Sequence, residues 1–372
     1  MATIAFLPYP EPGHMNASFK MAKNLNARGH RVYYLTLADY EEHLSSQGFN
    51  CVTIYENLFP KGFLRLEAVQ NNRENFAAIA LRAKAASHAF DPAKELYDIV
   101  GSIKPEMFVV DLLLPDLAAI VGRTGIPTIL INTMLLDPWT EMRAMYEPLM
   151  NLPELILCPQ EFDFPDAKRR SITHYVEASI DLGRKSVAFP WHKVDPDKPL
   201  IYCSLGSQSH LFNGYMEFLQ TMIDVMERRP RWQLVLAIGA GLEAEEFQPA
   251  HSNVLVVNVA PQLEMLKRAA IMISHAGLNS IKESIYFGVP MILFPVMRDQ
   301  PANAARAVYH GLGVKGRLQK ISVDLVQALI DQITTNPSFK ARAAKMAERF
   351  RELEDSAKGV QIIEAILEGS TN

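Results

Sequence analysis

Apolar runs of strand length alternate with helical segments along this chain, and this alternation limits its possible folds more than any other feature. In the first part, the expected strands are residues 4–7, 32–37, 51–55, 108–112 and 128–132. The expected helical segments between them are 15–27, 40–46, a long stretch within 67–90, and 116–122. The alternation resumes with strands at 200–205, 234–238, 254–257, 271–274 and 291–294. The pattern predicts an α/β fold, in which helices cover both faces of doubly wound parallel sheets.

A proline-rich stretch separates the two alternating parts. Prolines recur between residues 137 and 199, which favours loops, short helices and an interdomain connection. A chain of 372 residues is long enough for two domains that each bury a core. We expect a first domain at 1–190, which includes the connector, and a second at 191–350. The C-terminal helix at 351–372 would end a helical segment that spans roughly 339–367.

The composition excludes several classes of protein. The 37 basic and 41 acidic residues give a formal net charge of −4 without a long basic run, so nucleic acid is not an expected partner. No apolar run approaches the ~20 residues that cross a bilayer. Residues 1–9 lack the pattern of a signal peptide and predict a first strand. Cys51, Cys158 and Cys203 are widely spaced, as in a reducing compartment. We expect a cytoplasmic protein, a monomer or weak dimer.

The segment 259–304 carries the most specific chemical pattern. Its apolar strand stops at His275, and a turn of small residues that includes Gly277 follows. Asn279 and Ser280 then stand where a helix would be capped. A strand, a small-residue turn and a helix start bind phosphate, because the unpaired N–H groups and the positive end of the helix dipole face the anion.

Further polar residues in this segment indicate what the phosphate carries. Glu283 lies one turn along the expected helix, where its carboxylate could accept from ribose hydroxyls. Asp299 and Gln300 follow the next strand, so they share a sheet edge with His275. Together these residues predict a nucleoside diphosphate that carries a group rich in hydroxyls.

The segment resembles the donor-binding signature of nucleotide-sugar-dependent glycosyltransferases with the GT-B fold. That group includes plant natural-product, animal glucuronosyl and bacterial macrolide glycosyltransferases. The matching positions are Pro261, Gln262, His275, Gly277, Asn279, Ser280, Glu283, Gly288, Val289, Pro290, Pro295, Asp299, Gln300, Asn303 and Ala304. Gly206 and Ser207 match the turn that contacts the donor phosphates in the family. Many relatives have a tryptophan that stacks on the base where this chain has Val259, so the choice between uridine and thymidine stays open.

The resemblance implies a fold, a donor and a donor site. It implies two doubly wound, Rossmann-like domains that face each other across a cleft, with the last helix crossing back to the first domain. Glutamine at position 300 often accompanies glucose-type donors in the family. The donor-binding residues that the resemblance implies are Gly206, Ser207, Val259, Gln262, His275, Gly277, Asn279, Ser280, Glu283, Asp299 and Gln300.

A histidine and an aspartate in the first part form a candidate general base. His14 follows the first expected strand, and Asp111 ends a strand that would lie near it. Ligand sites in such sheets form at the carboxyl ends of strands, so the carboxylate could fix the tautomer of the imidazole. The alternative is that His14 is only an N-terminal helix residue. Asp116 also competes with Asp111, but its place beside Pro115 indicates a helix start.

In the resembling family, the histidine at the position of His14 deprotonates the acceptor hydroxyl, and the aspartate orients it. The implied reaction is an inverting transfer of a sugar from a UDP- or dTDP-sugar. The sequence has no acidic cluster or His/Cys set that indicates a metal. The expected enzyme is therefore independent of metal and uses the nucleotide sugar as co-substrate, without a cofactor.

The acceptor side is less constrained. Methionine and aromatic residues gather at 59–66 and 133–150, and such surfaces accept varied apolar molecules. Ordinary core packing is an equally good interpretation of these residues. Resemblance to the family implies a lipophilic small molecule with a hydroxyl group, such as a polyketide, flavonoid or terpenoid. The candidate acceptor contacts are Phe59, Met134, Trp139, Met142 and Tyr146.

Two other functions are also compatible with the sequence. One is a GT-B epimerase or hydrolase that acts on the nucleotide sugar itself, a chemistry that usually needs several acidic groups near the sugar. The other is a non-catalytic auxiliary protein that keeps the fold. Retention of both the His14–Asp111 pair and the donor signature argues against the second alternative.

Overall fold

The computed structural model describes residues 1–64, 91–137, 146–206, 209, 212–239, 242–247, 249 and 251–369. They form two compact units. Unit 1 comprises residues 1–160, 167–185 and 354–372, and unit 2 comprises 161–166 and 186–353. The helix expected within 67–90 lies wholly within residues 65–90, outside the described part of the chain.

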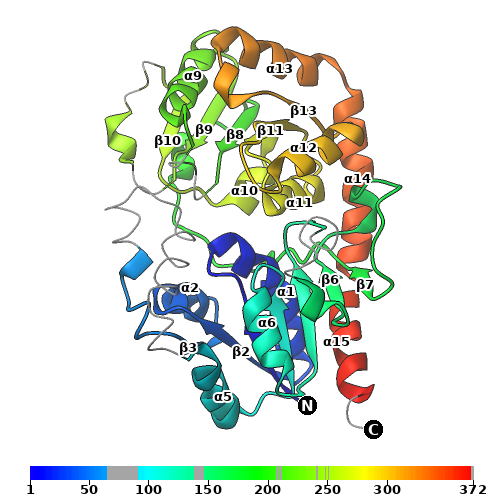
Figure 1. The fold of residues 1–372 in the computed structure, drawn as a ribbon. Coiled ribbons are helices and arrows are strands. Elements are labelled where there is room, and N and C mark those ends of the chain that lie inside the picture. Colours follow the sequence, from blue (N-terminus) through cyan, green and yellow to red (C-terminus); the bar gives the residue numbers. More distant parts are fainter. Residues whose placement is uncertain are drawn as a thin grey trace. The chain divides into compact units, whose positions relative to one another are not determined.

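Unit 1 is built on a parallel sheet whose strand order is β3-β2-β1-β4-β5-β6-β7 (Figure 1). Its strands are β1 (Thr3–Leu7), β2 (Arg31–Thr36), β3 (Asn50–Thr53), β4 (Met107–Asp111), β5 (Thr128–Asn132), β6 (Glu154–Ile156) and β7 (Thr173–Tyr175). β1, β4 and β5 are buried along their whole length, as expected for parallel strands covered on both faces. The order reverses between β1 and β4, which makes this the switch point of the sheet.

Five described helices accompany this sheet. They are α1 (Pro12–Ala27), α2 (Glu41–Ser46), α5 (Pro92–Ile103), α6 (Pro115–Gly122) and α15 (Lys358–Gly369). The last of these is far away in sequence, yet Val360 and Ile363 are fully buried in the same core cluster as Phe19 of α1. The C-terminal helix is therefore part of the core of unit 1.

Unit 2 contains a second parallel sheet, with the strand order β10-β9-β8-β11-β12-β13 (Figure 1). Its strands are β8 (Leu200–Ser204), β9 (Gln233–Ala237), β10 (Val254–Val257), β11 (Ala269–Ser274), β12 (Met291–Leu293) and β13 (Gly313–Lys315). Its described helices are α9 (Tyr215–Glu227), α10 (Gln262–Leu266), α11 (Leu278–Tyr286), α12 (Gln300–Tyr309), α13 (Val323–Thr335) and α14 (Ser338–Glu354). Here the order reverses between β8 and β11.

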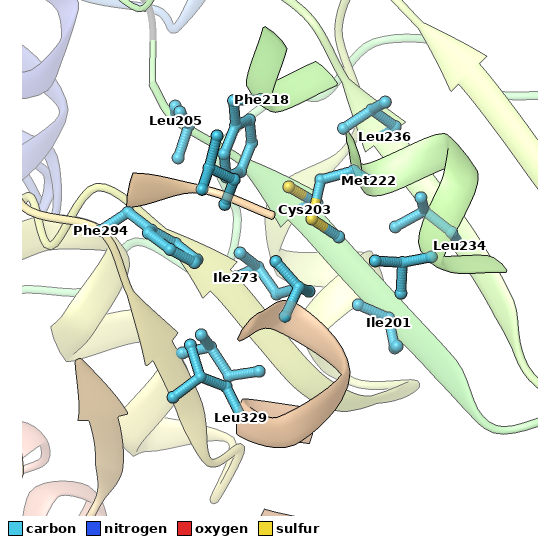
Figure 2. Packing of buried hydrophobic residues seen from close by; sticks show 14 of the residues in the cluster. Ile201, Cys203, Leu205, Phe218, Met222, Leu234, Leu236, Ile273, Phe294 and Leu329 are labelled. Carbon is cyan, nitrogen blue, oxygen red and sulfur yellow. The ribbon is translucent and has the colours of Figure 1, made fainter. Parts of the chain in front are cut away.

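The core of unit 2 lies between this sheet and its helices. Figure 2 shows side chains of β8, β9 and β11 packed against Phe218 and Met222 of α9 and Leu329 of α13. Cys203 lies among them and is fully buried, as is Cys158 in unit 1, whereas Cys51 is only partly buried. All three are free thiols, and Cys203 serves as a small apolar side chain.

The α/β class with two parallel sheets is confirmed, and all ten expected strands are present within one or two residues of their predicted ends. The stretch 137–199 was predicted to hold loops and short helices, but it also contains β6 and β7. Strand β13 was not predicted either. These strands have three residues each, too short to show a period.

The final helical segment is not continuous as predicted. It is divided into α14 and α15, and Ala357 between them has a positive φ of 48°. His14 was expected just before the first helix, but it is the third residue of α1, because Pro12 already starts the helix.

Candidate active site

The candidate base lies at the switch point of the unit 1 sheet. His14 is in the first turn of α1, directly after β1, and Asp111 is the last residue of β4. β1 and β4 are parallel neighbours in which Leu7 pairs with Val110, so their carboxyl ends adjoin. Thr133 follows β5, the next strand.

These three side chains form a buried hydrogen-bonded group. The Nδ1 atom of His14 lies 2.9 Å from Oδ2 of Asp111, and the two residues are 6% and 1% exposed. The hydroxyl oxygen of Thr133 lies 2.7 Å from the same nitrogen and 3.4 Å from the same carboxylate oxygen. The backbone N–H of Leu113 donates to the other oxygen of Asp111 at 2.9 Å.

The donor and acceptor roles follow from the chemistry of these groups. A carboxylate only accepts, so Nδ1 of His14 carries a proton and donates it to Asp111. The Thr133 hydroxyl then donates to Asp111, and its oxygen also faces the N–H. In the neutral ring this assignment leaves the lone pair on Nε2, the atom that could take a proton from a substrate.

Thr133 is the member of this group that the sequence prediction missed. The sequence feature that could have identified it is its position, because it is a polar residue directly after β5, the strand that pairs with β4. The loop that carries it is held by Asn132, whose amide donates to Glu154 at 2.8 Å and to the carbonyl oxygen of Leu136 at 2.8 Å. Arg170 donates to the same glutamate at 3.2 Å.

The candidate donor site lies at the switch point of the unit 2 sheet. His275 follows β11, and Gly206 follows β8, its parallel neighbour. A Cβ atom on Gly206 would lie 2.6 Å from Cε1 of His275, and one on Gly277 would lie 2.7 Å from Nε2. The imidazole thus lies against both glycines, so a side chain at either position would require the ring to move. Burial lowers the pKa of His275 to about 4.

Helix α11 begins two or three residues earlier than predicted. Its N-cap is Gly277, which has no side chain, so Asn279 and Ser280 are the second and third residues of the helix and not caps. The first turn of α11, residues 278–280, therefore follows directly after the His275–Gly277 turn at the end of β11. This geometry suits an anion such as phosphate.

Two residues predicted to bind the donor are brought together. The amide nitrogen of Gln262 in α10 donates to Oε2 of Glu283 in α11 at 2.6 Å, and it lies 3.4 Å from the Ser280 hydroxyl. Glu283 is 4% exposed. The neighbouring Lys282 is also buried, at 1% exposed.

Asp299 and Gln300 lie at the start of α12. Asp299 is the N-cap residue, and Gln300 is the first helical residue. The side-chain oxygen of Gln300 accepts from the backbone N–H groups of Val296 and Met297 at 2.9 and 3.0 Å. The side chain of Gln300 can therefore bind a ligand through the N–H donors of its amide.

The remaining candidates differ in exposure. Val259, after β10, is 54% exposed. Phe59 and Tyr146 lie inside the apolar core of unit 1, where the Tyr146 hydroxyl donates to the carbonyl oxygen of Leu112 at 2.8 Å. Met134 is also buried. Phe59 and Tyr146 therefore pack in the core, which was the alternative to acceptor binding for these residues. Ser207, Trp139 and Met142 lie outside the described residues.

Two structural features are absent from the described part of the chain. No helix there is long and apolar enough to cross a membrane. No group of three or more His, Cys, Asp or Glu side chains is arranged to hold a metal ion among the same residues.

Known proteins resemble this chain both in its second part and over its whole length. Residues 205–358 match the family model described as the glycosyltransferase family 28 C-terminal domain. The NDP-glycosyltransferase YjiC of Bacillus subtilis (strain 168) is 22% identical to this chain, with 99% of the chain and 98% of the relative covered. Oleandomycin glycosyltransferase of Streptomyces antibioticus is 24% identical, with 98% and 91% covered.

A solved structure extends the likeness to the whole fold. The spinosyn rhamnosyltransferase SpnG complexed with thymidine diphosphate superposes with a TM-score of 0.73 at 17% identity, and the alignment covers 98% of this chain and 100% of that one. This likeness confirms the predicted GT-B fold. The resemblance found in the sequence is confirmed as well.

Proposed function

We propose that this protein transfers a sugar from a nucleoside diphosphate sugar to a small-molecule hydroxyl, because residues 205–358 match the glycosyltransferase family 28 C-terminal domain and the chain has a GT-B fold. The observation that carries the proposal is the buried His14–Asp111 pair at the end of the unit 1 sheet. A donor-type site at the equivalent edge of the unit 2 sheet supports it.

The proposed step uses His14 as general base. Nε2 of His14 takes the proton of the acceptor hydroxyl, and the oxygen attacks the anomeric carbon from the face opposite the phosphate. The bond from that carbon to the phosphate oxygen breaks, and the nucleoside diphosphate leaves with the electron pair. One displacement inverts the anomeric configuration. Asp111 stabilises the imidazolium that forms.

The leaving group is proposed to bind at the start of α11. The negative charge that develops on the diphosphate would be stabilised by the first-turn N–H groups and by the imidazole of His275, a neutral donor at pH 7 because its pKa is about 4. These fixed donors would do the work of a divalent cation, so we propose a transfer that needs no metal. Glu283, held by Gln262, is the proposed contact of the ribose.

The donor is proposed to be a UDP- or dTDP-linked sugar of the glucose type, with Asp299 and Gln300 on its hydroxyls. The half-exposed Val259 offers no aromatic face to the base, so both bases stay in the proposal. The acceptor is proposed to be a lipophilic natural product, such as a polyketide, flavonoid or terpenoid. Relatives named for oleandomycin and for spinosyn support this class.

A direct test is to incubate the protein with UDP-glucose or dTDP-glucose and a panel of phenols, terpenoid alcohols and macrolides. The expected result is an acceptor heavier by one sugar, with the anomeric configuration opposite to that of the donor by NMR. Release of nucleoside diphosphate without an acceptor would instead indicate a hydrolase or epimerase. Failure to bind any nucleotide would indicate a non-catalytic protein.

A further inference from the structure

A chain of buried polar side chains begins at the start of α12, and the proposed reaction uses only its first member, Asp299. It runs from Asp299 through Asn303 and Arg306 to Asp163, which belongs to the connector segment within unit 2. The four residues are 7%, 0%, 8% and 3% exposed. Polar groups buried to this degree are costly unless they are satisfied, so their hydrogen bonds define one arrangement.

Asn303 is the centre of this chain. Its amide nitrogen donates to Oδ2 of Asp299 at 2.6 Å and lies 3.4 Å from the carbonyl oxygen of Ala276. Its amide oxygen faces a guanidinium nitrogen of Arg306 at 3.4 Å. The orientation is determined by chemistry, since a carboxylate and a carbonyl only accept and a guanidinium only donates.

Arg306 is itself anchored. Its Nε atom donates to Oδ1 of Asp163 at 2.7 Å, and its guanidinium carbon lies 5.2 Å from the centre of the Phe164 ring. The buried ion pair and the ring fix the guanidinium. This restricts the Asn303 amide to the orientation that donates to Asp299.

The Ala276 contact links this chain to the turn of the donor site. Ala276 lies between His275 and Gly277, with a positive φ of 70°. The Asn303 amide contacts both this turn and the carboxylate of Asp299. It therefore connects the proposed diphosphate site to the proposed sugar site and holds them at one separation.

We infer that Asn303 is a positioning residue that orients the Asp299 carboxylate toward the hydroxyls of the donor sugar. The inference rests on the proposed function, in which Asp299 contacts that sugar. Asn303 itself touches no substrate. It acts through Asp299, with Arg306 and Asp163 holding its amide. Loss of the amide should therefore affect binding of the sugar and leave binding of the nucleoside diphosphate nearly unchanged.

The test is calorimetric titration of the full-length protein with UDP, dTDP, UDP-glucose and dTDP-glucose. N303A removes the amide, and N303D places an acceptor against the Asp299 carboxylate and the Ala276 carbonyl. Each should weaken nucleotide-sugar binding by about 10- to 100-fold and change nucleotide binding by less than about 3-fold. The control is A307G, a buried change on the same helix that lowers helix stability and should leave the ratio of sugar-nucleotide to nucleotide affinity unchanged.

A double-mutant cycle separates positioning from structural support. If Asn303 acts through Asp299, then N303A should cost no further nucleotide-sugar affinity in a D299A background. Additive losses, or equal weakening of nucleotide and nucleotide sugar by N303A, would overturn the inference. N303A also carries the test if N303D does not fold.

The wild-type titrations distinguish the two levels of failure. A wild-type protein that binds none of the four ligands, or gains nothing from the sugar, contradicts the proposed function itself. A wild-type protein that gains affinity from the sugar, and keeps that gain in N303A and N303D, contradicts only the role of Asn303.

Discussion

The tautomer of His14 is the residue-scale property on which the proposed reaction depends. Its Nδ1 atom faces two oxygens, those of Asp111 and Thr133, and only the carboxylate is an obligatory acceptor. The proton is therefore held on Nδ1, and Nε2 keeps the lone pair. Thr133 and the backbone N–H of Leu113 fix the carboxylate in turn.

D111N tests this assignment. The amide nitrogen of asparagine would donate to Nδ1, move the ring proton to Nε2 and remove the base. We expect kcat to fall by about 10²- to 10⁴-fold, with donor KM changed by less than about 3-fold. Steady-state kinetics with the acceptor that the panel identifies would measure this, and a D111N enzyme with near-normal kcat would contradict the tautomer assignment.

His275 predicts a pH dependence of stability. Burial holds its pKa at about 4 in the folded protein, below the ordinary value of ~6.5. Between these values the unfolded chain binds the proton and the folded protein does not. The free energy of unfolding should therefore decrease as the pH falls from about 6.5 towards 4, by at most about 3 kcal/mol.

Urea unfolding at pH 7 and pH 5 would show this decrease in the wild-type protein, and in H275Q the decrease should be smaller. An H275Q variant with the same pH dependence as the wild type would assign the effect to other groups.

The sequence alone identified part of these residues. His14 and Asp111 follow apolar strands, so topology brought them together correctly, and His275 was placed at the sheet edge for the same reason. Thr133 was missed because its contact with His14 spans 119 residues and needs the order of β1, β4 and β5.

At the scale of elements, the turn between β11 and α11 depends on close packing of glycine against histidine. Gly206 has a φ of +85°, and any side chain there would also meet the His275 ring. The conformation of the turn and the position of the ring therefore depend on each other, and both lie at the start of α11.

G206A should disturb this arrangement. The added Cβ would lie 2.6 Å from Cε1 of His275, so the ring must move. We expect nucleoside diphosphate affinity to fall about 10-fold or more, since one charge-assisted hydrogen bond is worth about 1.5 to 3 kcal/mol. Titration with UDP and dTDP would measure it.

The matched control is G214A. Gly214 also has a positive φ, of +83°, but no atom lies within 4 Å of the added Cβ. Both variants should lose stability from backbone strain, and only G206A should lose nucleotide affinity. Equal nucleotide affinities in the two variants would contradict the proposed role of His275.

Elements were predicted well where their pattern was long. The strands of four or more residues were recognised because buried parallel strands are continuous apolar runs. β6 and β7 were not, since each has three residues and they lie among prolines. The break between α14 and α15 was missed because the positive φ is at Ala357, a residue that otherwise favours helix.

At the scale of the whole molecule, the two units have different proposed roles in the reaction. Unit 1 holds the proposed base, and unit 2 holds the proposed donor site, so their stabilities and functions should respond to different substitutions. The chain returns to unit 1 through α15, where Gly359 donates its N–H to Glu177 at 3.0 Å, and a Cβ would lie 2.5 Å from the methyl carbon of Met21.

G359V should therefore destabilise unit 1 alone. Overpacking at this position should lower its free energy of unfolding by about 1 to 3 kcal/mol, while UDP and dTDP affinity stays within about 2-fold of wild type. The control is G101V in α5, where no atom lies within 4 Å of the added Cβ. Thermal unfolding and nucleotide titration would test this, and a loss of nucleotide affinity in G359V would contradict the division between the units.

The most direct test of the central claim is the rate of sugar transfer by H14A under single-turnover conditions, beside its affinity for the donor. Removal of the base should slow transfer by about 10²- to 10⁴-fold, with donor affinity within about 3-fold of wild type. An H14A enzyme that transfers the sugar at the wild-type rate would contradict the assignment of His14 and the reaction built on it.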